Sequence, residues 1–295
     1  MLLECVPNFS EGRRRDVGDE IVAAVRAVSG ARFLDFEMDP DHNRSVLTLV
    51  GEPAAVAEAA FAAARVAVER IDLNRHEGRH PRMGAVDVIP FIPIRDLTMD
   101  DAVRTSRELG ARLGAELKLP VFLYEASATR PDRKNLAEIR KPQFEGLRDL
   151  IGKDPERLPD FGPPAIHPTA GCVAVGARPP LIAYNIDLES AEEKLAKRIA
   201  KKIRERDGGL PAIKALGLFI ADRGCVQVSI NVCDFTRTSL ETVYAAVERE
   251  ATAAGVKIRS SEIVGLAPQA ALPPGAVERL KLATFKPEQV IENRL

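Results

Sequence analysis

The chain has 295 residues, a length typical of one large α/β unit or of two domains of about 100–150 residues, and we expect two. With 45% hydrophobic and 29% charged residues, it can bury a substantial core without disulfides or a structural metal. A net charge of -1 excludes a general attraction to nucleic acid or to an anionic membrane, so we expect small-molecule partners. The N-terminus MLLECVPNF lacks the basic and long apolar regions of a signal peptide, which predicts a cytoplasmic protein.

Hydrophobic periodicity and turn residues predict alternating strands and helices in the first half. In chain order these are strand 2–6, helix 17–28, strands 31–37 and 44–50, helix 53–70, strand 86–94, helix 98–117 and strand 120–125. The polar turn DPDHN joins the second and third strands as a hairpin, and Thr98 caps the third helix. Pro90 and Pro93 cannot donate to a strand ladder, so their strand is expected at a sheet edge.

A proline-rich segment separates the two halves. Prolines recur so often over residues 155–168 that a helix interior and a central strand are excluded, and a loop is predicted. We place the domain boundary at Arg178. The elements predicted after it are strand 181–187, helix 193–206, strands 215–220 and 225–232, helix 238–255 and strand 256–265. Ser190 and Glu193 have the spacing of a capping box, and the stretch Thr238–Glu241 is expected to cap the later helix.

Both halves therefore show the order strand, helix, strand, strand, helix, strand. This order predicts an α+β fold of two ferredoxin-like (βαββαβ) subdomains, with mixed sheets and helices packed on one face. The subdomains are expected to span residues 1–178 and 179–295. The cysteines lie far apart without C-x-x-C spacing and are expected to be buried reduced thiols. They are Cys5, Cys172, Cys225 and Cys233.

The stretch HEGRH at residues 76–80 matches the H-E-x-x-H pattern of zinc metalloproteases. That pattern works only on a helix, which places both histidines on one face. Gly78 between the histidines and Pro81 after the second oppose a helix, and Val86 stands where a third histidine would be needed. We therefore predict a loop and no metal site.

The same loop concentrates titratable and guanidinium groups just before strand 86–94. An imidazole titrates near pH 6.5, so a positioned histidine can take up and return a proton in the cell. The alternative is that these are solvated loop charges, with His80 only hydrogen-bonded near the surface. The residue pattern alone leaves both interpretations open.

Several long strings resemble those of the formiminotransferase family, the transferase portion of formiminotransferase-cyclodeaminase. They are ECVPNFSEG (4–12), DPDHNRSV (39–46), RHEGRHPRMGAVDVIPFIP (75–93), DFGPPAIHPTAG (160–171) and QVSINVCDF (227–235). The resemblance covers nearly the whole chain. It implies a homodimer of two-subdomain chains that transfers the formimino group from N-formimino-L-glutamate to N5 of tetrahydrofolate in histidine degradation. Tetrahydrofolate is the expected co-substrate, without a metal.

The resemblance also implies where the chemistry occurs. The family's catalytic histidine lies in its H-P-R-M-G string, which corresponds to His80. The donor's two carboxylates favour arginine partners, and its cationic amidine favours carboxylates. The expected substrate-binding residues are Arg82, Arg44, Asn43, Asn8, Glu37 and Glu11.

The family's folate-binding segment aligns with residues 162–171. These are Gly162, Pro163, Pro164, Ala165, Ile166, His167, Pro168, Thr169, Ala170 and Gly171. Its prolines and glycines are expected to shape a loop at the seam between the halves, a common place for ligand clefts. The alternative is a plain interdomain linker, and neither His76 nor His167 acquires a role.

Other functions compete with formimino transfer. A related enzyme would move a formyl group between 5-formyltetrahydrofolate and glutamate, and a regulatory module would bind folate without turnover. The basic helix 193–206 lacks interleaved aromatic residues, so we expect a solvated face and no nucleic-acid contact. Contact with a folate polyglutamate tail is a minor alternative for that helix. No second helical module follows, so no cyclodeaminase activity is expected.

Overall fold

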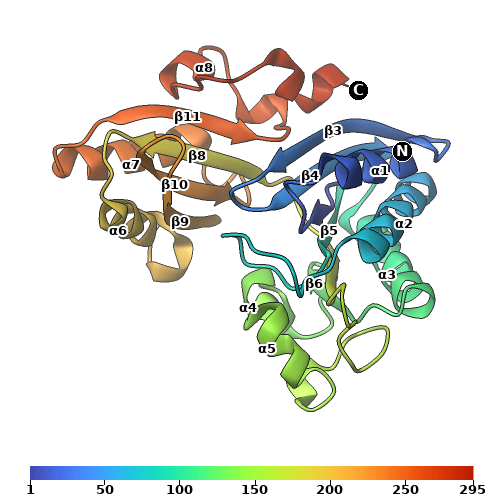
Figure 1. Cartoon of the computed structure of the whole chain (residues 1–295). Coiled ribbons are helices and arrows are strands. Elements are labelled where there is room, and N and C mark those ends of the chain that lie inside the picture. Colours follow the sequence, from blue (N-terminus) through green and yellow to red (C-terminus); the bar gives the residue numbers. More distant parts are fainter. Residues whose placement is uncertain (295) are drawn as a thin grey trace. The chain divides into compact units, whose positions relative to one another are not determined.

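The computed structural model describes residues 1–294 and contains two compact units, Met1–Arg178 and a second that begins at Pro179 (Figure 1). Each unit combines a β-sheet with packed helices, which confirms the predicted α+β fold class. Among the described residues, no helix is long and apolar enough to cross a membrane.

The first unit alternates strands and helices in nearly the predicted order. Its strands are β1 (Leu2–Cys5), β2 (Asn8–Phe9), β3 (Ala31–Asp39), β4 (Arg44–Gly51), β5 (Val86–Arg95), β6 (Val121–Glu125) and β7 (Val173–Ala177). Its helices are α1 (Arg15–Arg26), α2 (Pro53–Arg70), α3 (Met99–Glu116), α4 (Leu136–Arg140) and α5 (Gln143–Leu150). The cap predicted at Thr98 is present, and Asp101 completes it as a capping box. The sequence pattern predicts neither β7 nor the short helices α4 and α5.

The sheet of the first unit has an antiparallel part and a parallel part that meet at β5. β1 and β2 lie between β4 and β5, and β3 pairs with β4, which is the ferredoxin-like strand order. β7 then pairs parallel with β5, and β6 pairs parallel with β7. Parallel neighbours need crossover connections, which α3 and the α4–α5 segment supply.

The prediction that residues 86–94 form an edge strand is wrong, because β5 has partners on both sides. The Pro90 carbonyl accepts the Val6 N–H at 3.2 Å, so the N–H that Pro90 lacks would point to the same side. That side is where the neighbouring chain is interrupted between β1 and β2. Pro93 pairs with Leu3 beside a register shift. Both prolines therefore fall at irregularities of the ladder, which local sequence does not reveal.

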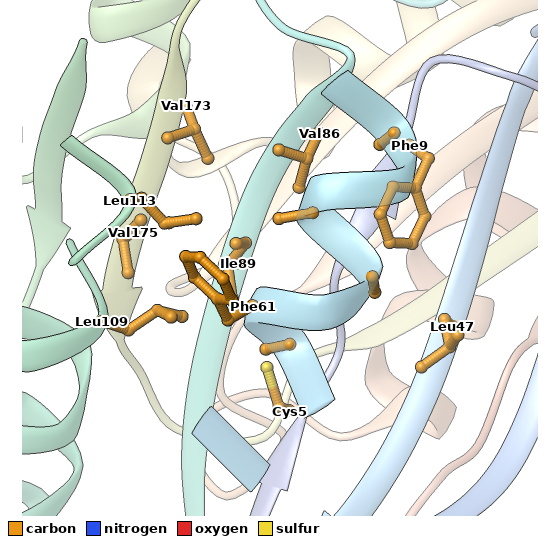
Figure 2. Packing of buried hydrophobic residues seen from close by; sticks show 14 of the residues in the cluster. Cys5, Phe9, Leu47, Phe61, Val86, Ile89, Leu109, Leu113, Val173 and Val175 are labelled. Atoms are coloured by element: carbon orange, nitrogen blue, oxygen red, sulfur yellow. The ribbon is translucent and has the colours of Figure 1, made fainter. Parts of the chain in front are cut away.

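The main core of the first unit lies between the sheet and helices α1, α2 and α3. Alanines along α2 are buried, which lets this helix approach its neighbours closely. Burying one large apolar side chain contributes about 1.5–3 kcal/mol, so this cluster dominates the stability of the unit. Figure 2 labels Cys5, Phe9, Leu47, Phe61, Val86, Ile89, Leu109, Leu113, Val173 and Val175 in it.

A smaller hydrophobic cluster involves the other side of β6 and β7, because alternate residues of a strand point to opposite faces. Val121 belongs to the main core, whereas Phe122 packs in this second cluster with Val88 of β5. Ile139 of α4 and Leu147 of α5 cover it. This packing fixes α4 and α5 over the strand that follows the HEGRH loop.

The second unit has the predicted ferredoxin-like order. Its elements are β8 (Ile182–Leu188), α6 (Glu193–Ile203), β9 (Ile213–Ile220), β10 (Cys225–Val232), α7 (Leu240–Ala253), β11 (Ile258–Val264) and α8 (Ala276–Arg279). The strands are antiparallel in the order β11, β8, β10, β9. Short 3₁₀ segments complete both units. They are Pro131–Arg133, Pro155–Arg157, Glu205–Asp207, Gln269–Ala271, Pro287–Gln289 and Ile291–Arg294.

Of the helix caps predicted in the second unit, one is confirmed and one is wrong. The cap predicted within Thr238–Glu241 is present, and the capping residue is Ser239, which accepts the Thr242 N–H at 3.2 Å at the start of α7. Ser190 instead accepts the Glu192 N–H at 3.1 Å, and α6 begins at Glu193 without a side-chain cap. The hydroxyl forms a local turn before the helix, a common competing use of serine.

Cys5, Cys172 and Cys225 are buried thiols, as predicted, whereas the prediction of burial is wrong for Cys233, which is only partly buried. Burial raises the pKa of Cys5 and of Cys172. A thiol that stays protonated is a poor nucleophile. These two side chains therefore serve packing.

Candidate active site

The HEGRH segment lies in a loop, as predicted, with no helix over residues 71–85. The loop is tied to its surroundings through its backbone. Leu73 N–H donates to the Thr169 carbonyl at 2.8 Å, and Ala85 N–H donates to the Ala170 carbonyl at 2.8 Å. Within residues 1–294 there is no group of three or more His, Cys, Asp or Glu side chains that could hold a metal ion.

His80 is partly buried in this loop. Its Nδ1 lies 2.7 Å from the Pro81 carbonyl, which can only accept, so Nδ1 carries the proton and Nε2 has the lone pair of a base. Burial lowers the pKa of His80 well below its ordinary value, and the charges of Arg44 and Arg140 lower it further against the opposing effect of Asp87. The ring is therefore an unprotonated proton acceptor at neutral pH.

Asp87 is the charged centre of the site and is fully buried. Its Oδ1 accepts the N–H of Met83, in the His80 loop, at 2.8 Å. Its Oδ2 accepts from Arg44 Nη1 at 2.9 Å and from Arg140 Nη2 at 2.7 Å. Burial alone would raise the pKa of Asp87, but the two guanidinium groups hold it well below its ordinary value. One carboxylate thus joins β4, β5 and α4.

The structure brings together Arg44 and Asn8, two of the predicted substrate-binding residues. The Asn8 Oδ1 accepts from Arg44 Nη2 at 2.9 Å and from Nε at 3.2 Å. The Asn8 amide nitrogen donates to the Val6 carbonyl at 2.8 Å. With Asp87 on Nη1, each nitrogen of the Arg44 guanidinium has a protein partner.

Arg82 is also paired within the protein. Its Nη1 and Nη2 donate to the Glu145 carboxylate of α5 at 2.8 and 2.6 Å. Its Nε donates to Nδ1 of His76 at 3.1 Å, so His76 Nε2 carries the proton and donates to the Asn43 carbonyl at 2.8 Å. This chain of contacts gives His76, which had no role from sequence, a place in holding the loop against the β3–β4 turn.

Asn43 adopts a left-handed backbone, with φ of 46°, a conformation that Asn tolerates better than most residues. Its Oδ1 accepts the Gly12 N–H at 2.9 Å, and its Nδ2 donates to the Glu77 carbonyl at 2.9 Å. The side chain therefore fixes the turn to two other segments.

The two predicted carboxylates have different surroundings. Glu11 is buried, and its Oε1 accepts the backbone N–H groups of Arg13 and Arg14, each at 2.9 Å. Burial opposes ionisation, but these bonds and the Arg14 ion pair lower the pKa of Glu11. Glu37 lies on β3 opposite Val46 of β4. Glu11 thus orders the start of α1.

The start of the segment 162–171 is anchored by Asp160, which lies two residues before it. Asp160 accepts the Leu123 N–H of β6 at 2.8 Å and pairs with the buried Arg133 at 2.5 Å. Gly162 has a φ of 85°, and a Cβ there would lie 2.1 Å from the Leu119 carbonyl oxygen. Only glycine meets both demands.

The end of the segment is a tight turn. His167 and Gly171 exchange backbone hydrogen bonds at 3.0 and 3.1 Å. The His167 Nδ1 accepts the Ala170 N–H at 3.0 Å. This histidine therefore closes the turn with its own side chain, a role that its sequence position did not indicate.

We expect Gly162→Ala to lower the free energy of unfolding by about 3 kcal/mol, because it adds backbone strain and a backbone clash. Gly208→Ala is the matched control. Gly208 has a φ of 88°, yet an added Cβ would meet nothing within 4 Å, so a loss of about 1 kcal/mol is expected. Urea denaturation followed by circular dichroism measures both. Equal losses would contradict the role assigned to the Leu119 contact.

The charged residues missed by the sequence analysis are Asp87, Arg140 and Glu145. One signal was available for Asp87, which is the only charged residue in the apolar stretch VDVIPFIPI. A carboxylate inside a buried strand must be paired. No comparable pattern marks Arg140 or Glu145, which lie in a segment without predicted elements.

Comparisons with known proteins agree along the whole chain. A family model described as the N-terminal subdomain of the formiminotransferase domain matches residues 2–178, and one described as the formiminotransferase domain matches residues 183–291. Glutamate formimidoyltransferase of Streptococcus pyogenes serotype M1 is 45% identical, over 100% of this chain and 98% of its own. The enzyme of that name from Thermoplasma acidophilum is 45% identical, over 100% and 97%. The formimidoyltransferase-cyclodeaminase of Rattus norvegicus is 41% identical, over 100% of this chain and 56% of its own.

Proposed function

This chain belongs to the formiminotransferase family, and we propose that it transfers the formimino group from N-formimino-L-glutamate to N5 of tetrahydrofolate, releasing L-glutamate. The observation that carries the mechanism is the state of His80. Its proton sits on Nδ1, and its pKa is lowered, so Nε2 is available as a base.

The reaction requires one proton to move twice. N5 of tetrahydrofolate attacks the formimino carbon, a carbon–nitrogen bond forms, and a tetrahedral intermediate results. His80 Nε2 takes the proton from N5. The resulting imidazolium returns it to the glutamate nitrogen as the old carbon–nitrogen bond breaks, which leaves the histidine neutral again. A lowered pKa makes the imidazolium a ready donor in the second step.

We also propose which residues bind folate and the formimino donor. We assign folate binding to Gly162–Gly171, a segment whose shape is set by glycine and turn contacts. Arg82, Arg44, Asn43, Asn8, Glu37 and Glu11 are the proposed substrate-site residues. Among these, Asn8 and Asn43 act through the residues that they hold in place.

The assay that tests this function mixes the protein with tetrahydrofolate and either N-formimino- or N-formyl-L-glutamate and follows the folate absorbance. We expect turnover with the formimino donor and about 100-fold less with the formyl donor, since its neutral amide differs in charge and hydrogen bonding. Preference for the formyl donor would support the formyl-transferring alternative. A thermal shift with tetrahydrofolate but no product from either donor would indicate a binding module.

We further propose that the enzyme acts in histidine degradation and one-carbon metabolism, in the cytoplasm, as a homodimer. Sedimentation equilibrium of the purified chain tests the last point, with an expected mass of twice 32.1 kDa. A single species of 32.1 kDa at micromolar concentration would contradict it.

A further inference from the structure

The donor carries two carboxylates, and the arginines predicted to bind them already have partners. Arg82 uses Nη1 and Nη2 on Glu145 and Nε on His76. Arg44 uses Nη1 on Asp87, and Nε and Nη2 on Asn8. Either arginine would have to give up or share a short contact to take a ligand.

Arg140 differs from both. It is the last residue of α4, its side chain is 13% exposed, and its Nη2 donates to Asp87 at 2.7 Å. Its Nε is buried and has no hydrogen-bond partner among the described residues. A buried donor without a partner is unfavourable, so this guanidinium is incompletely satisfied by the protein.

The charge balance around Asp87 points the same way. Arg44 and Arg140 both pair with the carboxylate of Asp87, so these three mostly buried residues together carry one net positive charge. Such a cluster favours one further anion. Asp87 also accepts the Met83 N–H of the His80 loop. The positively charged group of residues is therefore hydrogen bonded to the loop that carries the proposed acid–base histidine.

We propose that Arg140 binds the α-carboxylate of the formimino donor, while Asp87 holds its guanidinium in position. The assignment rests on the proposed function and adds a residue to it. The α-carboxylate is bonded to the same carbon as the reacting nitrogen, whereas the other carboxylate is separated from it by a flexible chain. The anion nearest to the His80 chemistry is therefore the α-carboxylate. Arg140 shares Asp87 with Met83 of the His80 loop, and its Nε has no partner among the described residues.

The first test is Arg140→Gln in the full chain. Losing a charge-assisted contact to the donor should raise KM for N-formimino-L-glutamate by about 10- to 100-fold, with KM for tetrahydrofolate within about twofold of wild type. Arg104→Gln is the control, because Arg104 is an exposed residue of α3 paired with Asp101, and it should change neither constant. Thermal melting checks that both variants are folded. An unchanged donor KM in Arg140→Gln would overturn the assignment.

The second test removes the ligand group instead of the arginine. The formimino derivative of 4-aminobutyrate lacks the α-carboxylate but keeps the distal one. Wild type should use it about 10- to 100-fold less efficiently than the natural donor, and Arg140→Gln should discriminate between the two by less than about threefold. Equal discrimination in both proteins would show that another group reads the α-carboxylate. Absence of wild-type turnover with the natural donor would instead contradict the proposed function itself.

Discussion

Replacing His80 by alanine is expected to lower kcat by about 10²–10⁴-fold, the range typical of losing a general acid–base. Tetrahydrofolate binding should be largely kept, because no residue of Gly162–Gly171 is hydrogen bonded to the His80 side chain among the contacts described. Steady-state kinetics with N-formimino-L-glutamate and a folate titration followed by fluorescence measure the two effects. Loss of folate binding together with kcat would show that the imidazole is a structural group.

The pH dependence gives an independent check on the same residue. The pKa of His80 is lowered, so its active, unprotonated form persists as pH falls through about 6.5, where an ordinary histidine would become protonated. The acid limb of kcat/KM should therefore lie below about pH 6.5. A limb above that value would contradict the described environment of the ring.

Replacing Asp87 by alanine is expected to lower the free energy of unfolding by about 3–5 kcal/mol, because two guanidinium groups lose their shared carboxylate within the structure. Activity should fall as well, since the His80 loop loses its tie at Met83. Urea denaturation gives the stability and the folate assay the activity. The control is Asp132→Ala, whose exposed pair with Arg130 should contribute less than about 1 kcal/mol. Similar losses in both variants would contradict the central place of Asp87.

Acid should remove this stabilisation in wild type. The folded pKa of Asp87 lies below its unfolded value of about 3.9, so the contribution is present above about pH 4 and is lost as pH falls further. Asp87→Asn removes the ionisable group but keeps a similar shape. The difference in stability between wild type and Asp87→Asn should therefore shrink below about pH 4. A difference that stays constant down to about pH 2.5 would be inconsistent with an ionised, paired carboxylate.

Most of the fold could be predicted because its elements have strong local signals. The hairpin of β3 and β4 follows from a turn-rich DPDHN, and α6 from the spacing of Leu195, Ile199 and Ile203, each of which is buried. By contrast, β7 is held by parallel pairing with β5 and β6, and α4 and α5 are short helices stabilised by packing against β5 and β6. The central position of β5 is compatible with Pro90 because the neighbouring chain is interrupted between β1 and β2. Such features are set by tertiary contacts and not by local sequence.

The candidate site was predicted in part for a similar reason. Gly78 and Pro81 are enough to exclude a helix around the HEGRH pattern, and the family resemblance singles out His80. The environment of His80 depends on Asp87 and Arg140, which are hydrogen bonded to each other although they lie 53 positions apart in the sequence. Pairings over such separations follow from the fold, so they become visible only once β5 and α4 are in place.

The sharing of Asp87 by two arginines has an evolutionary consequence. If Arg140 is exchanged for a neutral residue, Arg44 still pairs with the buried Asp87 carboxylate, and the net charge of the pair is zero. Substitutions at position 140 would then change which donors the enzyme accepts without destabilising the fold. Drift at position 87 has no such freedom, because both cations depend on it.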